Sequence, residues 1–179
     1  MEATGSCYYP SPYDKKSGLI NGQKIFEYAN SLCGAGTYAN NGCAIIAIYN
    51  AMQLLDNPQS LGSIEHEFSW EHGMLMLGLW GVAPWSFDDY FHAHKVSNAG
   101  YRYYDTMMHN ISEGDVVVFT VVNNVWNPFD GFHTMTAQYV GGQFVVYNAY
   151  RGYAYSWTCS SLSAIYDNSK WVYGYIVGG

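Results

Sequence analysis

The feature that most constrains the fold is a long apolar run that follows Cys43. Between Ala44 and Leu55 the only strongly polar side chains are Asn50 and Gln53. A run of this length is too long for an ordinary strand, and it predicts a helix that is buried on nearly all sides. We therefore expect the rest of the chain to pack around this segment.

The ends of this helix place Cys43 in its first turn. Asn41 and Gly42 favour a helix start, and the Asp-Asn-Pro sequence at 56–58 stops it. Unpaired N–H groups and the positive end of the helix dipole favour a thiolate there, so Cys43 is a candidate nucleophile. A free cysteine beside an apolar helix more often serves as a small buried side chain, so a partner base is needed to support this role.

Composition indicates one globular domain over residues 1–179, with an extended arm at 1–20. Hydrophobic residues make up 49% of the chain and charged residues 12%, which excludes a disordered protein. The net charge of −7 and the lack of a basic run argue against nucleic acid as a partner. No apolar stretch reaches the roughly 18 residues of a membrane span.

The spacing of apolar residues changes from helical to strand-like after Gly100. We predict helices at 21–32, 43–56, 60–70, 71–80 and 86–95. We predict strands at 101–104, 116–122, 132–140, 143–150 and 171–177, with a possible extension at 153–157 and a helical turn at 160–166. Gly141-Gly142 is a tight hairpin turn. Helices followed by antiparallel strands predict an α+β fold, with the central helix packed on a C-terminal sheet.

The four cysteines are irregularly spaced and do not predict a disulfide framework or a zinc site. A single disulfide between Cys7 and Cys159 remains an alternative. The preferred interpretation is a reducing compartment with one reactive thiol. The start of the chain lacks a signal pattern. The protein is expected to be cytoplasmic if the chain is complete, and secreted if a signal peptide has been removed. His92 and His94 fall on different helix faces, so we expect no metal or other cofactor.

Two residues on the predicted hairpin complete a catalytic set with Cys43. If Val140 pairs with Gln143 across the turn, Asn148 lies opposite Met135 and shares a face with His133. The two side chains are then diagonal neighbours within hydrogen-bonding reach. Each residue alone is more often structural, but the order of helix cysteine, strand histidine and strand asparagine is uncommon.

Thiol chemistry assigns a role to each residue of this set. Cys43 is the expected nucleophile, His133 the base and later the acid, and Asn148 the group that orients the imidazole. Asn40, Asn41 and the backbone N–H of Cys43 are the expected oxyanion donors.

Three short motifs resemble those of papain-like cysteine peptidases, in the compact bacterial form related to the bacteriocin-processing (double-glycine leader) peptidases. Residues 41–51 resemble the nucleophile helix, and residues 113–119 the strand before the histidine. Residues 131–137 and 145–149 resemble the strands that carry the histidine and the third member. The resemblance implies a papain-like fold and a triad of Cys43, His133 and Asn148.

The chain departs from the family pattern at several positions. Family members usually carry a Gln about six residues before the cysteine, where this chain has Thr37, so Asn40 or Asn41 would replace it. Ala44 stands where Gly is often found. The leader peptidases usually have Asp as third member, whereas Asn148 matches papain itself.

The expected function is that of a cysteine peptidase-like hydrolase, which cleaves a peptide or amide bond of a peptide or protein substrate through a thioester. The same triad could serve an acyltransferase, transglutaminase or deamidase. A non-enzymatic binding module on this fold is the other hypothesis, since the usual Gln is missing and Tyr and Trp, favoured at recognition surfaces, are abundant.

Overall fold

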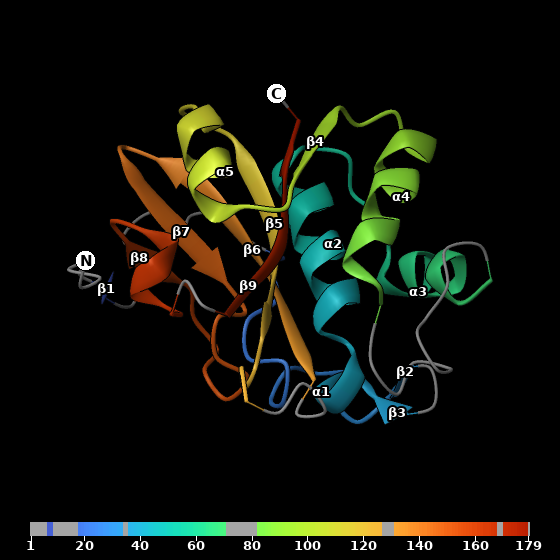
Figure 1. Ribbon diagram of the computed structural model, residues 1–179. Coiled ribbons are helices and arrows are strands. Elements are labelled where there is room, and N and C mark those ends of the chain that lie inside the picture. The colour runs from blue at the N-terminus through green and yellow to red at the C-terminus, as the bar shows by residue number, and fades with distance from the viewer. Residues whose placement is uncertain are drawn as a thin grey trace.

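The structure is a computed structural model, in which an antiparallel sheet forms the centre of the fold (Figure 1). It describes residues 7–8, 18–33, 36–70, 82–126, 131–167 and 170–178. Within these residues the strand order is β1-β8-β7-β6-β5-β9-β4. The strands are β1 (Cys7–Tyr8), β4 (Asn98–Tyr101), β5 (Val116–Val122), β6 (Phe132–Val140), β7 (Gln143–Tyr147), β8 (Trp157–Cys159) and β9 (Trp171–Val177). A separate hairpin joins β2 (Leu32–Cys33) to β3 (Gly36–Thr37).

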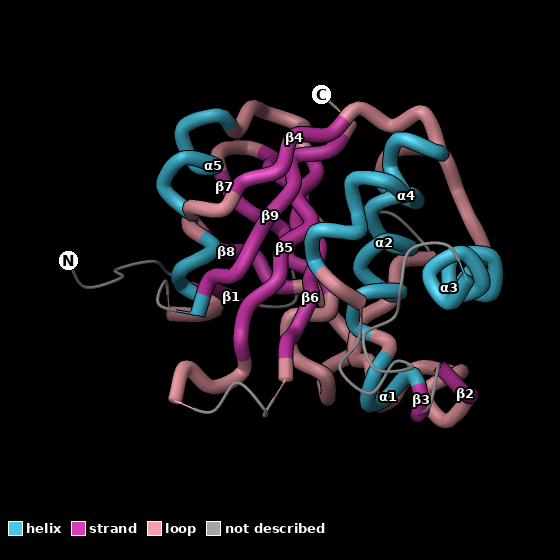
Figure 2. Tube along the Cα trace, turned by 45° about the vertical axis from the view of Figure 1, so that its right-hand side comes forward, coloured by secondary structure: helices cyan, strands magenta, loops and turns pink. Residues whose placement is uncertain are grey.

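Helices cover both faces of the sheet (Figure 2). On one face lie α2 (Cys43–Leu54), α3 (Leu61–Trp70) and α4 (Phe87–Ala93), with the short α1 (Tyr38–Asn41) and η2 (Pro84–Ser86) leading into α2 and α4. On the other face lie α5 (Tyr104–Asn110) and η4 (Leu162–Ala164). The α+β class predicted from the sequence is confirmed.

The central strand β5 explains why the sheet needs two covers. Val116 and Val118 pack into the core that contains α2, whereas Val117 and Phe119 pack into the core beneath α5. Successive side chains of a strand point to opposite faces, so an unbroken β-branched run buries both sides.

The helix α2 is buried along most of its length, as its sequence predicts. Ile45, Ile46 and Ile48 have no exposed surface. A hydrogen bond from Thr136 Oγ1 to the carbonyl oxygen of Ala47, 2.6 Å long, fixes the helix against β6. This contact fixes the position of Cys43, along the axis of α2, relative to the start of β6.

The predicted strands 116–122, 132–140 and 171–177 and the helices at 43–56 and 60–70 are confirmed, to within two residues at each end. The hairpin register is also confirmed, with Val140 opposite Gln143 and Thr136 opposite Tyr147. The predicted strand 143–150 is shorter, because β7 ends at Tyr147 where Asn148 takes a positive φ of 55°.

The helix predicted at 21–32 is wrong. This segment is a series of turns, in which Gly22 has a φ of +68° and accepts hydrogen bonds from the N–H groups of Ile25 and Phe26. The backbone N–H of Gln23 is bound to Asn148 across the molecule. The apolar residues at helical spacing are therefore buried by turns and not by a helix. Hydrogen bonds to distant residues override the local helical pattern.

The strand predicted at 101–104 is displaced. The strand β4 covers Asn98–Tyr101, and Tyr104 already begins α5, a helix that the sequence did not predict. The predicted helix at 86–95 is shorter, because the hydroxyl of Ser86 donates to the carbonyl oxygen of Ala83 and does not cap α4. The predicted helix at 71–80, and most of the arm at 1–20, lie outside the described residues.

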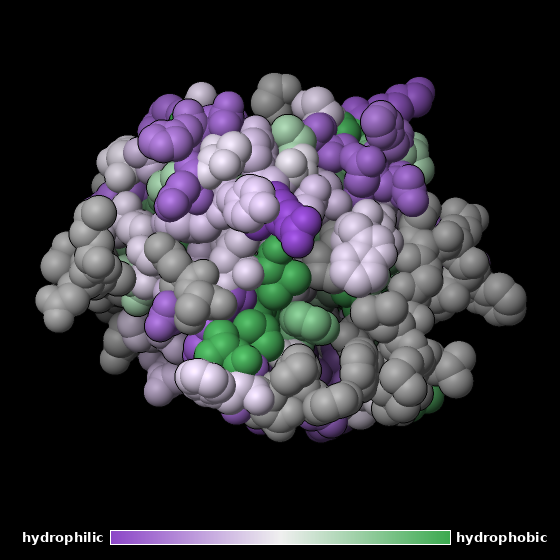
Figure 3. All heavy atoms as spheres, viewed as in Figure 1, coloured by the Kyte–Doolittle hydropathy of each residue, from purple (hydrophilic) through white to green (hydrophobic). Residues whose placement is uncertain are grey.

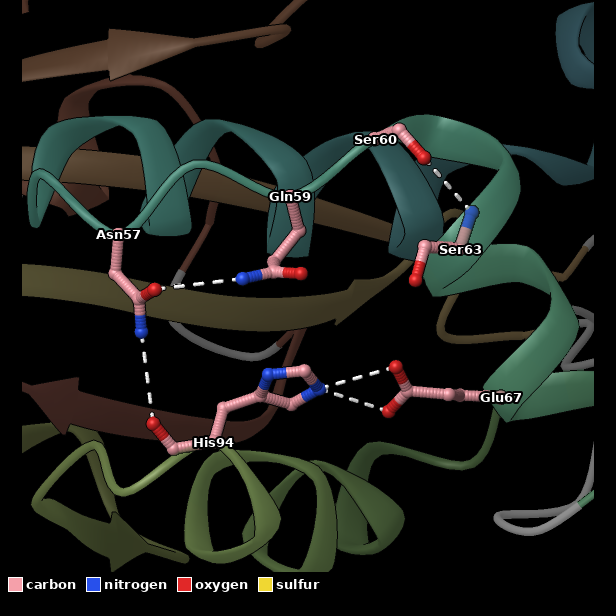
Figure 4. Close-up of polar contacts among 6 residues, drawn as sticks. All are labelled: Asn57, Gln59, Ser60, Ser63, Glu67 and His94. Atoms are coloured by element: carbon pink, nitrogen blue, oxygen red, sulfur yellow. Dashed lines mark hydrogen bonds and ion pairs between the residues drawn. The ribbon is translucent and has the colours of Figure 1, made fainter.

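Polar contacts join α3 to the end of α4 (Figure 4). The ring nitrogen Nε2 of His94 lies 2.8 Å from a carboxylate oxygen of Glu67, and Asn57 donates to the carbonyl oxygen of His94. The hydroxyl of Ser60 accepts from the N–H of Ser63 at the start of α3. These contacts are remote from Cys43 in sequence and hold the helical layer together.

The cysteines divide into two kinds. Cys33 and Cys43 are free thiols, whereas Cys159 is disulfide-bonded and lies opposite Cys7 in the pairing of β8 with β1. The disulfide of Cys159 agrees with the single disulfide that the sequence leaves open. Because stable disulfides are typical of oxidising compartments, it does not favour the preferred interpretation of a reducing compartment.

One face of the molecule carries a group of hydrophobic side chains among polar ones. On the face seen in Figure 3, hydrophobic side chains gather near the centre and are framed by more polar residues. Exposed hydrophobic side chains are ordinary on a globular protein. In the part of the chain that the structure describes, no helix is long and apolar enough to cross a membrane.

Candidate active site

Cys43 is the first residue of α2 and retains 5% of its surface exposed. Its Sγ lies 3.9 Å from the carbonyl oxygen of Phe132, the residue before His133. The first turn of α2 has no acidic side chain and no side-chain cap on its N–H groups. The first turn of α2 therefore has no negative side chain that would oppose a negative charge at the sulfur. The positive end of the helix dipole points towards it.

His133 is a buried residue near the start of β6, and one of its ring nitrogens is held firmly. Its Nε2 lies 2.7 Å from the backbone carbonyl oxygen of Asn148. Because a carbonyl oxygen only accepts, Nε2 carries the proton of the neutral ring, and Nδ1 keeps its lone pair. Nδ1 is buried and has no hydrogen-bond partner among the described residues, so its lone pair is available to accept a proton.

Burial, followed by the positive charge of Arg151, lowers the pKa of His133 from 6.5 to about 4. Hydrogen bonds to the backbone of Asn148 and Ala149 act against these two effects. The imidazole is therefore neutral at physiological pH, which is the form that can accept a proton.

Asn148 holds His133 through its backbone and not through its side chain, which differs from the sequence-based expectation. Its Oδ1 accepts from the N–H of Gln23 at 3.0 Å, and its Nδ2 donates to Oε1 of Gln23 at 3.4 Å. Asn21 Oδ1 accepts from the N–H of Asn148. The side chain fixes the turn, and the turn presents the carbonyl oxygen to the imidazole.

Gln23 is a site residue that the sequence analysis missed. It has no exposed surface, and its Nε2 donates to the carbonyl oxygens of Tyr38 and Ala39 at 2.7 and 3.2 Å. Gln23 therefore ties Asn148 to α1, the short helix that leads into Cys43. No local pattern indicates this role, because both partners are distant in sequence.

The two predicted side-chain oxyanion donors lie on α1. Asn40 is exposed, while Asn41 is partly buried with its amide packed over Gly36. Neither has a hydrogen bond to Cys43 or His133 among the described residues. The backbone N–H of Cys43 is the predicted donor whose position at the helix start fits the role.

Cys43 and His133 have no hydrogen bond to each other among the described residues, and their side chains lie on different faces of β6. Thr136 faces α2, whereas Met135 and Ala137 pack in the core on the other side of the sheet. Alternation along β6 gives His133 the same side as Met135. The sulfur thus reaches the backbone of this strand at Phe132, close to its edge, where β7 has already ended.

Cys33 provides an internal comparison for Cys43. It has no exposed surface, and burial, followed by the charges of Glu65 and Cys43, raises the pKa of its thiol to about 12. Cys33 is therefore a structural thiol, which stays protonated at physiological pH.

Comparison with known proteins adds no family assignment. No protein-family model matches the chain, and no similar sequence was found among curated proteins. Among the described residues, no group of three or more His, Cys, Asp or Glu side chains could hold a metal ion.

Proposed function

We propose that this protein is a papain-like thiol hydrolase that cleaves a peptide or amide bond through Cys43 and His133. The observation that carries the proposal is the contact of a helix-start cysteine with the residue that precedes a histidine whose Nδ1 is unprotonated. Sγ of Cys43 contacts the carbonyl oxygen that precedes His133, and Nε2 of His133 is anchored by Asn148. The motifs that resemble papain-like peptidases give the same assignment.

In the first half of the reaction, Sγ of Cys43 attacks the substrate carbonyl carbon while Nδ1 of His133 takes the thiol proton. The Nε2 proton stays with the carbonyl oxygen of Asn148, which stabilises the imidazolium. The backbone N–H of Cys43 donates to the oxyanion. Collapse of the intermediate expels the amine, which takes the proton from Nδ1 and leaves a thioester on Cys43.

In the second half, water attacks the thioester carbonyl. Nδ1 of His133 takes a proton from the water, and Cys43 leaves as the thiol after accepting that proton. The carboxylic acid is released, and both side chains return to their starting states. If an amine replaces water, the same steps transfer the acyl group.

The reaction requires Sγ and Nδ1 to meet at the edge of β6 beyond Tyr147. Catalytic hydrogen bonds are often long or misaligned without substrate and tighten in the complex. The end of β7 and the turn at Asn148 leave this edge without a paired strand. Because His133 shares the sheet face of Met135, away from α2, the proposal requires the start of β6 to turn so that Nδ1 meets Sγ.

Incubation with a mixed peptide pool tests the proposal. New peptide termini, mapped by mass spectrometry, should appear with the wild-type protein and with Cys33→Ala. They should be absent with Cys43→Ala and with His133→Gln. Adding hydroxylamine separates the reaction types, because an acyl-transfer enzyme would accumulate hydroxamates. No cleavage or transfer by any variant, with biological activity retained in Cys43→Ala, would leave the binding-module hypothesis.

A further inference from the structure

Arg151 lies beside the candidate nucleophile. Its Nη2 donates to the carbonyl oxygen of Phe132 at 3.4 Å, the same oxygen that Sγ of Cys43 approaches to 3.9 Å. The guanidinium and the sulfur therefore flank one atom at the edge of β6. The backbone of Arg151 is itself fixed, because its carbonyl oxygen accepts from the N–H of Lys24 at 2.8 Å.

The guanidinium of Arg151 has no acidic partner among the described residues. The chain has 14 acidic and only 7 basic Lys and Arg residues, yet no carboxylate in the described part of the chain pairs with this cation. Within the described residues the guanidinium donates to Phe132 alone, and most of its N–H donors remain for a ligand. A partly buried cation left unpaired next to a nucleophile is costly unless a ligand completes it.

Building on the proposed function, we propose that Arg151 is a specificity residue that binds a carboxylate on the substrate next to the scissile bond. The planar guanidinium can bind both oxygens of a carboxylate with parallel hydrogen bonds. This contact would hold the scissile carbonyl near Sγ of Cys43. The carboxylate is either the C-terminal group of the substrate or an Asp or Glu side chain.

Two alkylating reagents of equal size test this inference without a known substrate. Iodoacetate carries a carboxylate, and iodoacetamide is its neutral counterpart. In both reactions an Sγ–carbon bond forms, iodide leaves, and the thiol proton passes to His133. Each rate is measured at Cys43 by peptide mapping, and the iodoacetate-to-iodoacetamide ratio is compared with that of glutathione.

The wild-type ratio should exceed that of glutathione by about tenfold, the size of one charge-assisted hydrogen bond. Arg151→Gln should reduce the ratio to the glutathione value, and Arg151→Lys should give an intermediate ratio. Lys24→Gln is the matched control, since it removes the same charge from an exposed neighbouring residue and should leave the ratio unchanged. Thermal unfolding confirms that each variant is folded.

The outcomes separate this inference from the proposed function. A wild-type ratio equal to that of glutathione, or an equal fall in Arg151→Gln and Lys24→Gln, overturns the role of Arg151 alone. Failure of native Cys43 to react with either reagent overturns both. Matched peptides then distinguish the two sources: preference for a free C-terminus over its amide, or for Glu over Gln, identifies the carboxylate.

Discussion

Among single residues, Gln23 is the one on which the candidate site most depends. It has hydrogen bonds with Tyr38 and Ala39 on one side and with Asn148 on the other. Through Asn148 it acts on His133, and through α1 it acts on Cys43. It is a positioning residue, because it contacts neither reacting atom.

Substitution of Gln23 by Ala should destabilise the protein by about 1–3 kcal/mol, because buried partners are left unsatisfied. The rate at which iodoacetamide alkylates Cys43 should also fall. Gln59→Ala is the control. In the described part of the chain Gln59 makes a single side-chain hydrogen bond, to Asn57 (Figure 4), and its loss should change stability by less than about 0.5 kcal/mol. Urea unfolding measures the stability change in each variant, and peptide mapping measures the alkylation rate of Cys43. Equal effects of the two substitutions would contradict the role assigned to Gln23.

At the scale of elements, two glycines report on how tightly helices and strands are packed. Gly62 lies near the start of α3, and a Cβ added there meets nothing within 4 Å. Gly174 lies in β9, where an added Cβ would meet the Trp171 ring at 2.6 Å and Sδ of Met107 at 3.0 Å. The Trp171 ring is itself stacked on Phe119.

Gly62→Ala should stabilise the protein by about 0.5–1 kcal/mol, because alanine loses less entropy in a helix. Gly174→Ala should destabilise it by about 1–3 kcal/mol, because the rings must shift to admit a methyl group. Thermal unfolding of both variants checks the signs. Destabilisation by Gly62→Ala would mean that α3 is packed differently from this account.

The elements also show what sequence alone could predict. The apolar run of α2 and the β-branched run of β5 are long, and their burial follows from their own composition. The segment at 21–32 was misassigned because Gln23 binds to residues that are distant in sequence. The turn at Asn148 was missed for a similar reason, since its left-handed backbone is stabilised by Asn21 and Gln23.

The candidate site shows the same division between local and distant information. Cys43 at a helix start and His133 at a strand start follow from local patterns. The register of β6 and β7 follows from the Gly141-Gly142 turn. That the backbone of Asn148, and not its amide, holds His133 depends on where the strand ends. That end is set by contacts with a loop more than a hundred residues earlier in the chain.

For the whole molecule, the neutral state of His133 links folding to pH. Its pKa is about 4 in the folded protein and 6.5 ordinarily. Above pH 6.5 both the folded and unfolded forms are neutral, so stability does not change. As the pH falls from 6.5 towards 4, His133 binds a proton in the unfolded chain but not in the folded protein. Stability is therefore lost over this range, by up to about 3 kcal/mol.

Urea unfolding of wild type and His133→Gln between about pH 4 and pH 7 measures this loss. The wild type should lose more stability on acidification than the variant, because other titrating groups are common to both. Parallel curves would show that His133 has an ordinary pKa in the folded state.

The central claim is that His133 activates the thiol of Cys43, and competitive alkylation tests it most directly. Native protein is treated with iodoacetamide near pH 7.5, and modification of Cys43 and Cys33 is followed by peptide mapping. Cys43 should react at least about a hundredfold faster than Cys33, and His133→Gln should remove most of that advantage. Equal rates at the two thiols, or a Cys43 rate unchanged by His133→Gln, would contradict the account.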